Sequence, residues 1–205
     1  MNNLKEYWAE THRKSNVRYL TGSCGNTVWD SLQITDLIKP DSVILNIGVG
    51  LGKCTISLSR LCKNIYVLDI CKEAIDRVSS FIKAGWLAEN INEMPENYFD
   101  LAISHLVAQH MTDDELENQI KYVIKSLKPD GIFAMQFLTY MTNQNPKQDK
   151  CREGTNTRSL DEIAEMIKKN NGLIVNTPPS VQYNNHLLDG VRIDAEWKFV
   201  QIKRK

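Results

Sequence analysis

The sequence predicts an α/β fold: a doubly wound, mostly parallel seven-stranded sheet with an antiparallel last strand, and a helical extension at the N-terminus. Short β-rich runs alternate with longer segments of helical period, the pattern of a parallel sheet covered by helices. No helical segment separates the last two β-rich runs, so we expect them to be antiparallel neighbours. The expected organisation is a helical extension or cap over residues 1–40, followed by one α/β domain over residues 41–205.

The expected strands are short runs rich in β-branched and apolar residues. The first is apolar enough to be buried on both faces, and the third is weak. In chain order they are expected at residues 42–47, 64–69, 85–88, 99–104, 132–138, 173–176 and 196–203.

Helices are expected after the first, second, fourth and fifth strands, each with an apolar stripe of helical period. The last two begin with capping boxes, Thr112 with Glu115 and Ser159 with Glu162. We expect the turn Lys128–Gly131 to end the third helix. The predicted inward residues are Cys54, Leu58, Leu61 and Cys62, then Ile75, Val78 and Ile82, then Leu116, Ile120, Val123, Ile124 and Leu127, and finally Leu160, Ile163, Ala164 and Ile167.

Two stretches lie outside this alternation. Residues 1–40 read as mostly helical, and residues 140–158 are polar and without period, as lids and binding loops often are. We expect residues 1–25 and 140–158 to order when a ligand binds. The first stretch carries aromatic and basic side chains that suit either ligand contact or packing against the sheet: Tyr7, Trp8, His12, Arg13, Arg18, Tyr19 and Trp29.

Composition excludes several classes of partner. The chain has 25 basic and 25 acidic residues, so no net field attracts nucleic acid or an anionic membrane. No stretch approaches the ~20 apolar residues of a membrane-spanning helix, and the start does not resemble a signal peptide. The 5 cysteines form no C-x-x-C pair. We therefore expect reduced thiols, no metal site and a cytoplasmic protein.

A glycine-rich turn follows the first strand, with Gly48, Gly50 and Gly52 spaced by two. Such glycines let the backbone turn tightly and a ligand approach closely, although a structural turn would also use them. Asp69 ends the second strand, where a carboxylate can accept both hydroxyls of an adenosine ribose or can cap the next helix. Together the two features favour an adenosine ligand.

From about residue 40 onward the chain resembles the class I S-adenosylmethionine-dependent methyltransferases, which have a Rossmann-like fold. Five segments match motifs of that family in the right order, and the order makes the resemblance specific. These segments are 43–52 (VILNIGVGLG), 67–70 (VLDI), 90–100 (NINEMPENYFD), 105–111 (HLVAQHM) and 127–131 (LKPDG).

The resemblance implies S-adenosylmethionine as cofactor and a role for each matching residue. Gly48 and Gly50 would lie against its methionine part, in a turn that includes Val49. Asp69 would hold the ribose hydroxyls, and Ile70 would pack on the adenine. Asn90 would face the adenine amino group, and the Ile91 N–H would bind the ring.

Asn46 and Asn90 depart from the family, which usually has an acidic residue at the first position and often one at the second. We still place Asn46 among the cofactor-binding residues, because an asparagine can accept hydrogen bonds. It supplies no charge to attract the cofactor's ammonium group. A non-catalytic module that binds S-adenosylmethionine or a partner is therefore the alternative function.

The candidate catalytic residues are His105 and His110, which follow the fourth strand. By resemblance, His105 would lie near the methyl sulfonium, while His110 would act as a base or simply pack against the next helix. His186, between the last two expected strands, would line an acceptor pocket or lie on the surface.

The predicted reaction is methyl transfer to oxygen or nitrogen of a small-molecule acceptor by direct displacement, and a homodimer is compatible with the sequence. A dehydrogenase would need G-x-G-x-x-G, whereas Lys53 occupies the third glycine position. Base methylation of nucleic acid would need an Asn-Pro-Pro-Tyr-like motif, whereas Ser104–Val107 stand there. Protein acceptors, the methylated atom and the pathway stay open.

Overall fold

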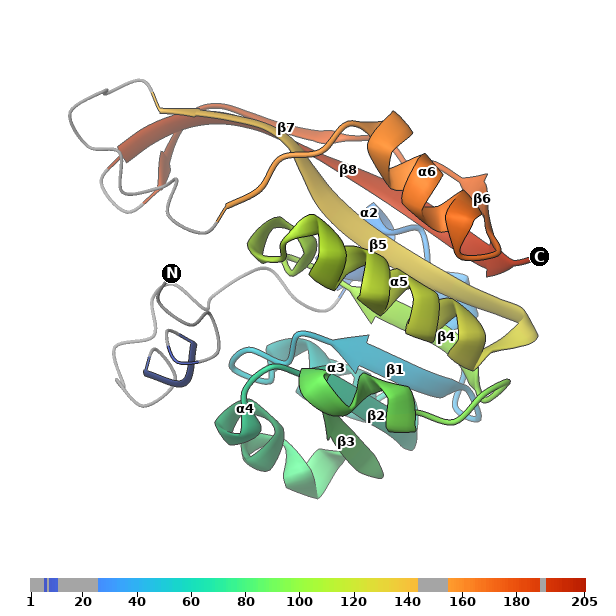
Figure 1. Ribbon diagram of the computed structural model, residues 1–205. Helices are drawn as coiled ribbons and strands as arrows, with labels where there is room; N and C mark the ends of the chain where they lie inside the picture. The colour runs from blue at the N-terminus through green and yellow to red at the C-terminus, as the bar shows by residue number, and fades with distance from the viewer. Residues whose placement is uncertain (1–5, 7, 11–25, 144–154, 189–190) are drawn as a thin grey trace.

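The computed structural model describes residues 6, 8–10, 26–143, 155–188 and 191–205. Its strands form one sheet in the order β3-β2-β1-β4-β5-β8-β6, and β7 also pairs with β8 (Figure 1). Strands β3, β2, β1, β4 and β5 are parallel, while β8 runs antiparallel to β5, β6 and β7. The strands are β1 Val43–Ile47, β2 Asn64–Asp69, β3 Ala84–Leu87, β4 Phe99–Ser104, β5 Leu127–Asn143, β6 Gly172–Asn176, β7 Val181–Leu188 and β8 Val191–Arg204.

The predicted doubly wound, mostly parallel sheet with antiparallel last strand is confirmed, but the sheet has 8 strands rather than the seven expected. Strand β7 was not predicted, because its sequence VQYNNHLL is too polar to read as a strand. It forms by pairing with β8. Strands β5 and β8 are longer than expected, because they pair with each other as far as Asn143 and Ile193. Together with β7 they extend beyond the rest of the sheet (Figure 1).

The helices follow the expected alternation, and both capping boxes form. The N–H of Glu115 donates to Thr112 Oγ1 at 3.3 Å, and that of Glu162 donates to Ser159 Oγ at 3.2 Å. The α-helices are α2 Asn26–Ser31, α3 Lys53–Ser59, α4 Lys72–Arg77, α5 Asp113–Ser126 and α6 Leu160–Lys169, and the 3₁₀ turns are η2 Thr35–Leu37, η3 Ser79–Phe81, η4 Ala88–Glu93 and η5 Ala108–His110.

Three local expectations were wrong. Leu61 is 46% exposed, because α3 ends at Ser59 and its apolar stripe goes no further. Ile82 lies in extended backbone after η3 rather than on a helix, although its side chain packs against the core as expected. The segment Lys128–Gly131 does not separate helix from strand. It lies within β5 as a bulge between the pairs Phe99↔Leu127 and Leu101↔Ile132.

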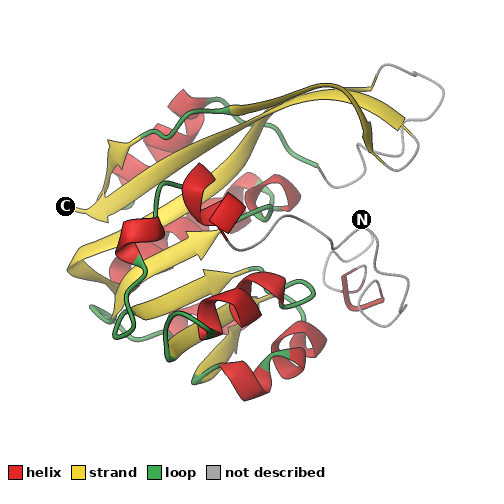
Figure 2. Ribbon diagram, turned by 180° about the vertical axis from the view of Figure 1, so that it is seen from behind, coloured by secondary structure: helices red, strands yellow, loops and turns green. Residues whose placement is uncertain are grey.

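Two apolar layers cover the sheet. Helices α5 and α6 pack on one face, which is the near face in Figure 1, and α2, α3 and α4 contribute to the core on the other. Figure 2 shows the second face with α2 in front. From the predicted N-terminal extension, Val28, Trp29, Leu32 and Ile34 are buried in that second core. Part of the extension therefore packs as an integral layer of the domain.

Most of the two stretches expected to order on binding lies outside the described residues, including Tyr7, His12, Arg13, Arg18 and Tyr19. Within the described part of the chain, no helix has the length and apolar character needed to cross a membrane. In that same part, no group of three or more residues of metal-ligand type comes together.

Candidate functional site

The candidate site lies at the carboxyl ends of β1, β2 and β4, where parallel strands of an α/β sheet commonly bind ligands. The turn after β1 has its three glycines at positive φ: +74° at Gly48, +54° at Gly50 and +83° at Gly52. A Cβ on Gly50 would have no heavy atom within 4 Å, whereas one on Gly52 would lie 2.5 Å from Val78 Cγ1. The turn is therefore packed at Gly52 and open at Gly50, where a ligand can reach the backbone.

Asp69 fixes this turn from the neighbouring strand. Its Oδ2 accepts a hydrogen bond from the Val49 N–H at 2.6 Å, and its Oδ1 accepts one from the Cys71 N–H at 2.8 Å. Burial raises the pKa of the Asp69 carboxyl, while backbone N–H groups, including those of Gly50 and Ile70, act in the opposite direction. A carboxylate has about four acceptor positions, and the short bonds from Val49 and Cys71 occupy two of them. Ligand hydroxyl groups would share the other positions with the Gly50 and Ile70 N–H groups.

The segment after β4 folds over the glycine turn. Leu106 has a φ of +58°, uncommon for a non-glycine residue, and its N–H donates to Gln136 Oε1 of β5 at 2.9 Å. The next residue, Val107, packs against Gly48: a Cβ added to Gly48 would lie only 2.2 Å from Val107 Cγ2. This face of Gly48 is therefore covered by protein, and the open approach is at Gly50.

The two candidate catalytic histidines belong to this same segment but have different surroundings. His105 is half-buried, and desolvation lowers its pKa to about 4, so the ring is neutral at neutral pH. His110 ends η5, and its ring makes an edge contact with Trp8 at 5.0 Å between centroids. Trp8 thus lies against the segment that follows β4.

Asn46 is the second-last residue of β1, just before the glycine turn, and is 2% exposed. Its Nδ2 donates to Thr55 Oγ1 of α3 at 3.0 Å, so the amide joins the strand to the helix that follows the turn. Unlike an acidic residue at this position, the Asn46 amide brings no charge to the site. Buried polar groups of this kind are typically held by just such hydrogen bonds.

The remaining predicted cofactor-binding residues surround this centre. Ile70 directly follows Asp69 and is half-buried. Asn90 and Ile91 lie in η4, after β3. Asn90 is exposed, while the Ile91 side chain is buried in the core, so only its backbone is available to a ligand.

The third histidine that the sequence singles out, His186, lies on β7 and is exposed. Its ring contacts Tyr183, whose ring meets Trp197, with centroid separations of 5.0 and 5.3 Å. It belongs to the extended strands rather than to the glycine turn.

Several polar residues near the site were not identified from the sequence. Ser104 ends β4 beside Ile47 of β1, and its buried Oγ has no hydrogen-bond partner. Gln136 holds Leu106, and Arg158 is buried although it comes from the stretch that reads as polar and irregular. No spacing signal identifies Gln136 and Arg158, because they bond backbone groups of distant segments.

These features fit an adenosine-containing ligand. The open backbone at Gly50, the buried carboxylate of Asp69 and the unpartnered hydroxyl of Ser104 lie at the carboxyl ends of neighbouring strands. The fit rests on polar groups that still have hydrogen-bonding capacity at an edge where the backbone can be approached.

Comparisons with known proteins agree with this geometry. Residues 45–135 match the family model described as "Methyltransferase domain". An uncharacterized methyltransferase from Synechocystis sp. is 29% identical over 101 residues, which are 48% of each chain. The match thus spans about half the length of that curated relative.

Solved structures show the same fold over the whole chain. A magnesium protoporphyrin IX methyltransferase from Synechocystis, with bound S-adenosylhomocysteine, has a TM-score of 0.68 at 13% identity, covering 99% of this chain and all of that one (100%). The 1,6-didemethyltoxoflavin-N1-methyltransferase from Burkholderia thailandensis, with bound 1,6-didemethyltoxoflavin and S-adenosylhomocysteine, has a TM-score of 0.67 at 16% identity, covering 98% of this chain and 87% of that one.

Proposed function

We propose that this chain is a class I S-adenosylmethionine-dependent methyltransferase, which transfers the methyl group of that cofactor to oxygen or nitrogen of a small-molecule acceptor. One observation carries the proposal. The Val49 N–H is bonded to the buried Asp69 carboxylate, while the backbone beside it at Gly50 stays open. This joins the glycine turn and the acidic end of β2 into one preformed site for a nucleoside-containing cofactor.

Each residue of this site has a proposed part in holding the cofactor. Gly48, Val49 and Gly50 present the turn, with Asn46 beneath it, to the methionine end. Asp69 holds the ribose hydroxyls with its remaining acceptor capacity. Ile70 packs on the adenine, and η4 contributes Asn90 and the Ile91 N–H.

When bound, the cofactor supplies a methyl group already activated by the positive sulfonium, so the chain mainly has to align the acceptor. A neutral His105 suits this environment, because it adds no positive charge beside a cation. With a pKa of about 4 it is also a weak base, so it is better suited to orienting the acceptor than to removing its proton. His110 is then the better candidate for accepting a proton from a hydroxyl or amine.

A small-molecule acceptor is supported by the balanced charge of the chain, which gives no net positive field to attract nucleic acid. The two solved relatives described above are named for small-molecule substrates. We extend the proposal to a cytoplasmic protein.

The test begins with calorimetric titration of S-adenosylmethionine and S-adenosylhomocysteine into the purified chain, with NAD as control. Binding of both that is lost in Asp69→Ala, with no binding of NAD, is the expected result. An acceptor screen with labelled S-adenosylmethionine follows. A folded chain that binds neither ligand would overturn the proposal, and binding without turnover of any acceptor would favour the non-catalytic module, for which the uncharged Asn46 is the specific evidence.

A further inference from the structure

Arg158 is a buried arginine next to the segment that covers the candidate site. Its side chain is 4% exposed, and in the described part of the chain only Asp69 is another buried residue that carries a charge. The backbone is fixed as well, because the Arg158 N–H donates to Leu138 O of β5 at 2.8 Å. Directly after it, the Ser159–Glu162 capping box starts α6.

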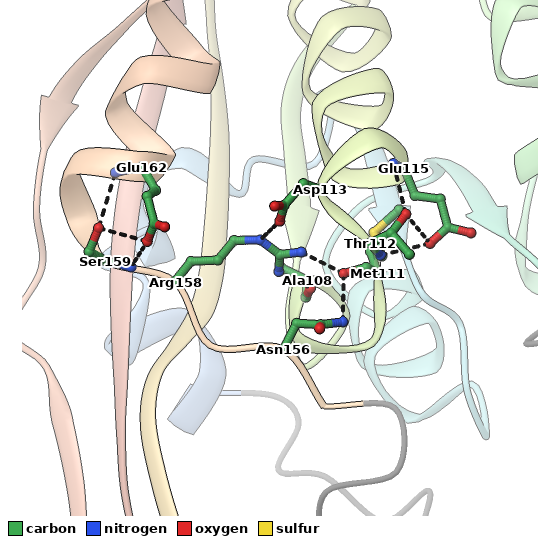
Figure 3. Close-up of polar contacts among 9 residues, drawn as sticks. All are labelled: Ala108, Met111, Thr112, Asp113, Glu115, Asn156, Arg158, Ser159 and Glu162. Carbon is green, nitrogen blue, oxygen red and sulfur yellow. Dashed lines mark hydrogen bonds and ion pairs between the residues drawn. The ribbon is translucent and has the colours of Figure 1, made fainter. Parts of the chain in front are cut away.

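Two donor nitrogens of the guanidinium are bonded to the segment between β4 and α5, and the third is bonded to Asp113, the first residue of α5 (Figure 3). Nη1 donates to Ala108 O at 2.9 Å, and Nη2 donates to Met111 O at 2.6 Å. Nε pairs with Asp113 Oδ1 at 2.8 Å, although the Asp113 side chain is 76% exposed. The rigid fork of an arginine suits this task, because it can reach separate acceptors at once.

Asn156 adds two hydrogen bonds to the same segment. Its N–H donates to Gln109 O at 2.6 Å, and its Nδ2 donates to Met111 O at 3.0 Å (Figure 3). Residues 156 and 158 therefore bond carbonyl groups of the short turn η5 and of Met111, which follows it. Carbonyls at the end of such a turn need partners from outside it.

The segment held in this way carries the residues that shape the site. Val107 lies against Gly48, His105 supplies the neutral ring, and His110 meets Trp8. None of the bonds of Arg158 described above goes to the glycine turn or to Asp69. Its influence on the site therefore passes through the position of residues 105–111.

We infer that Arg158 is a positioning residue for cofactor binding: its guanidinium fixes the segment after β4 in the position where Val107 covers Gly48. The inference rests on the proposed function, because cofactor affinity is its main readout. A residue that only joined α6 to α5 would affect stability throughout those helices without changing affinity in the folded protein.

The test compares Arg158→Lys with Arg204→Lys. Arg204→Lys is the control, because it replaces an arginine whose hydrogen bond is exposed and lies away from the site. In the unchanged chain, Arg204 Nη1 donates to Asn97 Oδ1 at 2.6 Å. Affinity for S-adenosylhomocysteine is measured by calorimetry well below the unfolding midpoint of each variant, and amide hydrogen exchange is followed along the chain. We expect about a tenfold loss of affinity in Arg158→Lys, since small displacements at a site have effects of this order or larger, together with faster exchange at residues 106–111. The control should change neither quantity.

Two further variants keep the test decisive if Arg158→Lys folds poorly. Asp113→Asn keeps the guanidinium and changes only an exposed partner, and it should lower affinity in the same direction by a smaller factor. In Arg158→Ala, millimolar guanidinium should restore part of the affinity, which a general loss of stability would not allow.

The proposal is overturned if a folded Arg158→Lys binds S-adenosylhomocysteine as the unchanged chain does. It is also overturned if exchange rises equally over α5 and α6 without a change of affinity, because Arg158 would then only join the helices. Failure of the unchanged chain to bind either cofactor form would instead overturn the proposed function. In that case exchange at residues 106–111 would still decide whether Arg158 holds the segment.

Discussion

The Cγ2 methyl of Val107 lies in the space that a side chain at position 48 would occupy, since a Cβ on Gly48 would be 2.2 Å from it. Gly48 also has a φ of +74°, which L side chains rarely adopt. The segment after β4 can therefore lie this close to the turn only when residue 48 has no side chain. Gly50 shares the positive φ but has open space beside it, so the two glycines can be separated by experiment.

Gly48→Ala should lower the free energy of unfolding by about 2–4 kcal/mol, which combines overpacking against Val107 with the cost of a positive φ. Gly50→Ala should cost only about 1 kcal/mol of stability, because it carries the backbone cost alone. Urea unfolding measures both. Adding Val107→Ala to Gly48→Ala should restore the steric part, and a double variant no more stable than Gly48→Ala would contradict this account.

Asp69→Asn should lower the free energy of unfolding by about 1–3 kcal/mol, because the amide has one acceptor oxygen for the two N–H groups of Val49 and Cys71. Affinity for S-adenosylhomocysteine should fall at least about tenfold, as expected for the loss of a bond to a charged acceptor. Calorimetry and urea unfolding separate the two effects.

The control for Asp69→Asn is Asp100→Asn. The Asp100 carboxylate accepts from the Val43 N–H and pairs with Lys128 at the opposite ends of these strands. This variant should lose stability while keeping affinity. An Asp69→Asn variant that binds as tightly as the unchanged chain would exclude the carboxylate from the cofactor site.

The features that the sequence predicts correctly have signals within a few residues. The glycines at 48, 50 and 52 do take positive φ values, and Asp69 does end β2 beside them. The capping boxes at Thr112 and Ser159 form for the same reason, because donor and acceptor lie three residues apart. The apolar strands β1 and β4 were found because burial on both faces removes polar residues.

The features that were missed depend on contacts between distant segments. Strand β7 contains Asn184 and Asn185, and pairing with β8 rather than local preference makes it a strand. Arg158 bonds backbone carbonyls about 50 residues away, and every residue type has such a carbonyl. The contact between Val107 and Gly48 likewise needs the fold, because nothing in either local sequence identifies the partner.

Asn46→Asp should raise affinity for S-adenosylmethionine by about three- to tenfold, because a carboxylate beneath the turn would attract the cofactor's ammonium group. The Thr55 hydroxyl, which accepts from Asn46 Nδ2, can rotate to donate to the new carboxylate. Calorimetry in low salt gives the affinity, and S-adenosylhomocysteine, which has the same ammonium group, should respond equally.

Unchanged affinity for both would show that position 46 does not face the ammonium. An enzyme should keep turnover in this variant, whereas a non-catalytic module should bind more tightly and still transfer nothing.

His105 should make stability depend on pH in a defined window. Its pKa in the folded chain is about 4 rather than the ordinary 6.5, because burial disfavours the charged ring. Between these values the unfolded chain binds more protons, so the free energy of unfolding rises with pH from about 4 to 6.5 and is level above that range. The contribution lost between pH 7 and pH 5 should be about 2 kcal/mol.

Urea unfolding of His105→Gln at the two pH values should show a correspondingly smaller difference than the unchanged chain, while His186→Gln, at an exposed position on β7, should keep it. Equal pH dependence in His105→Gln and in the unchanged chain would mean that the ring is solvated. In that case His105 would be protonated below pH 6 and could add positive charge beside the sulfonium, and methyl transfer should then weaken as the pH falls through 6.5.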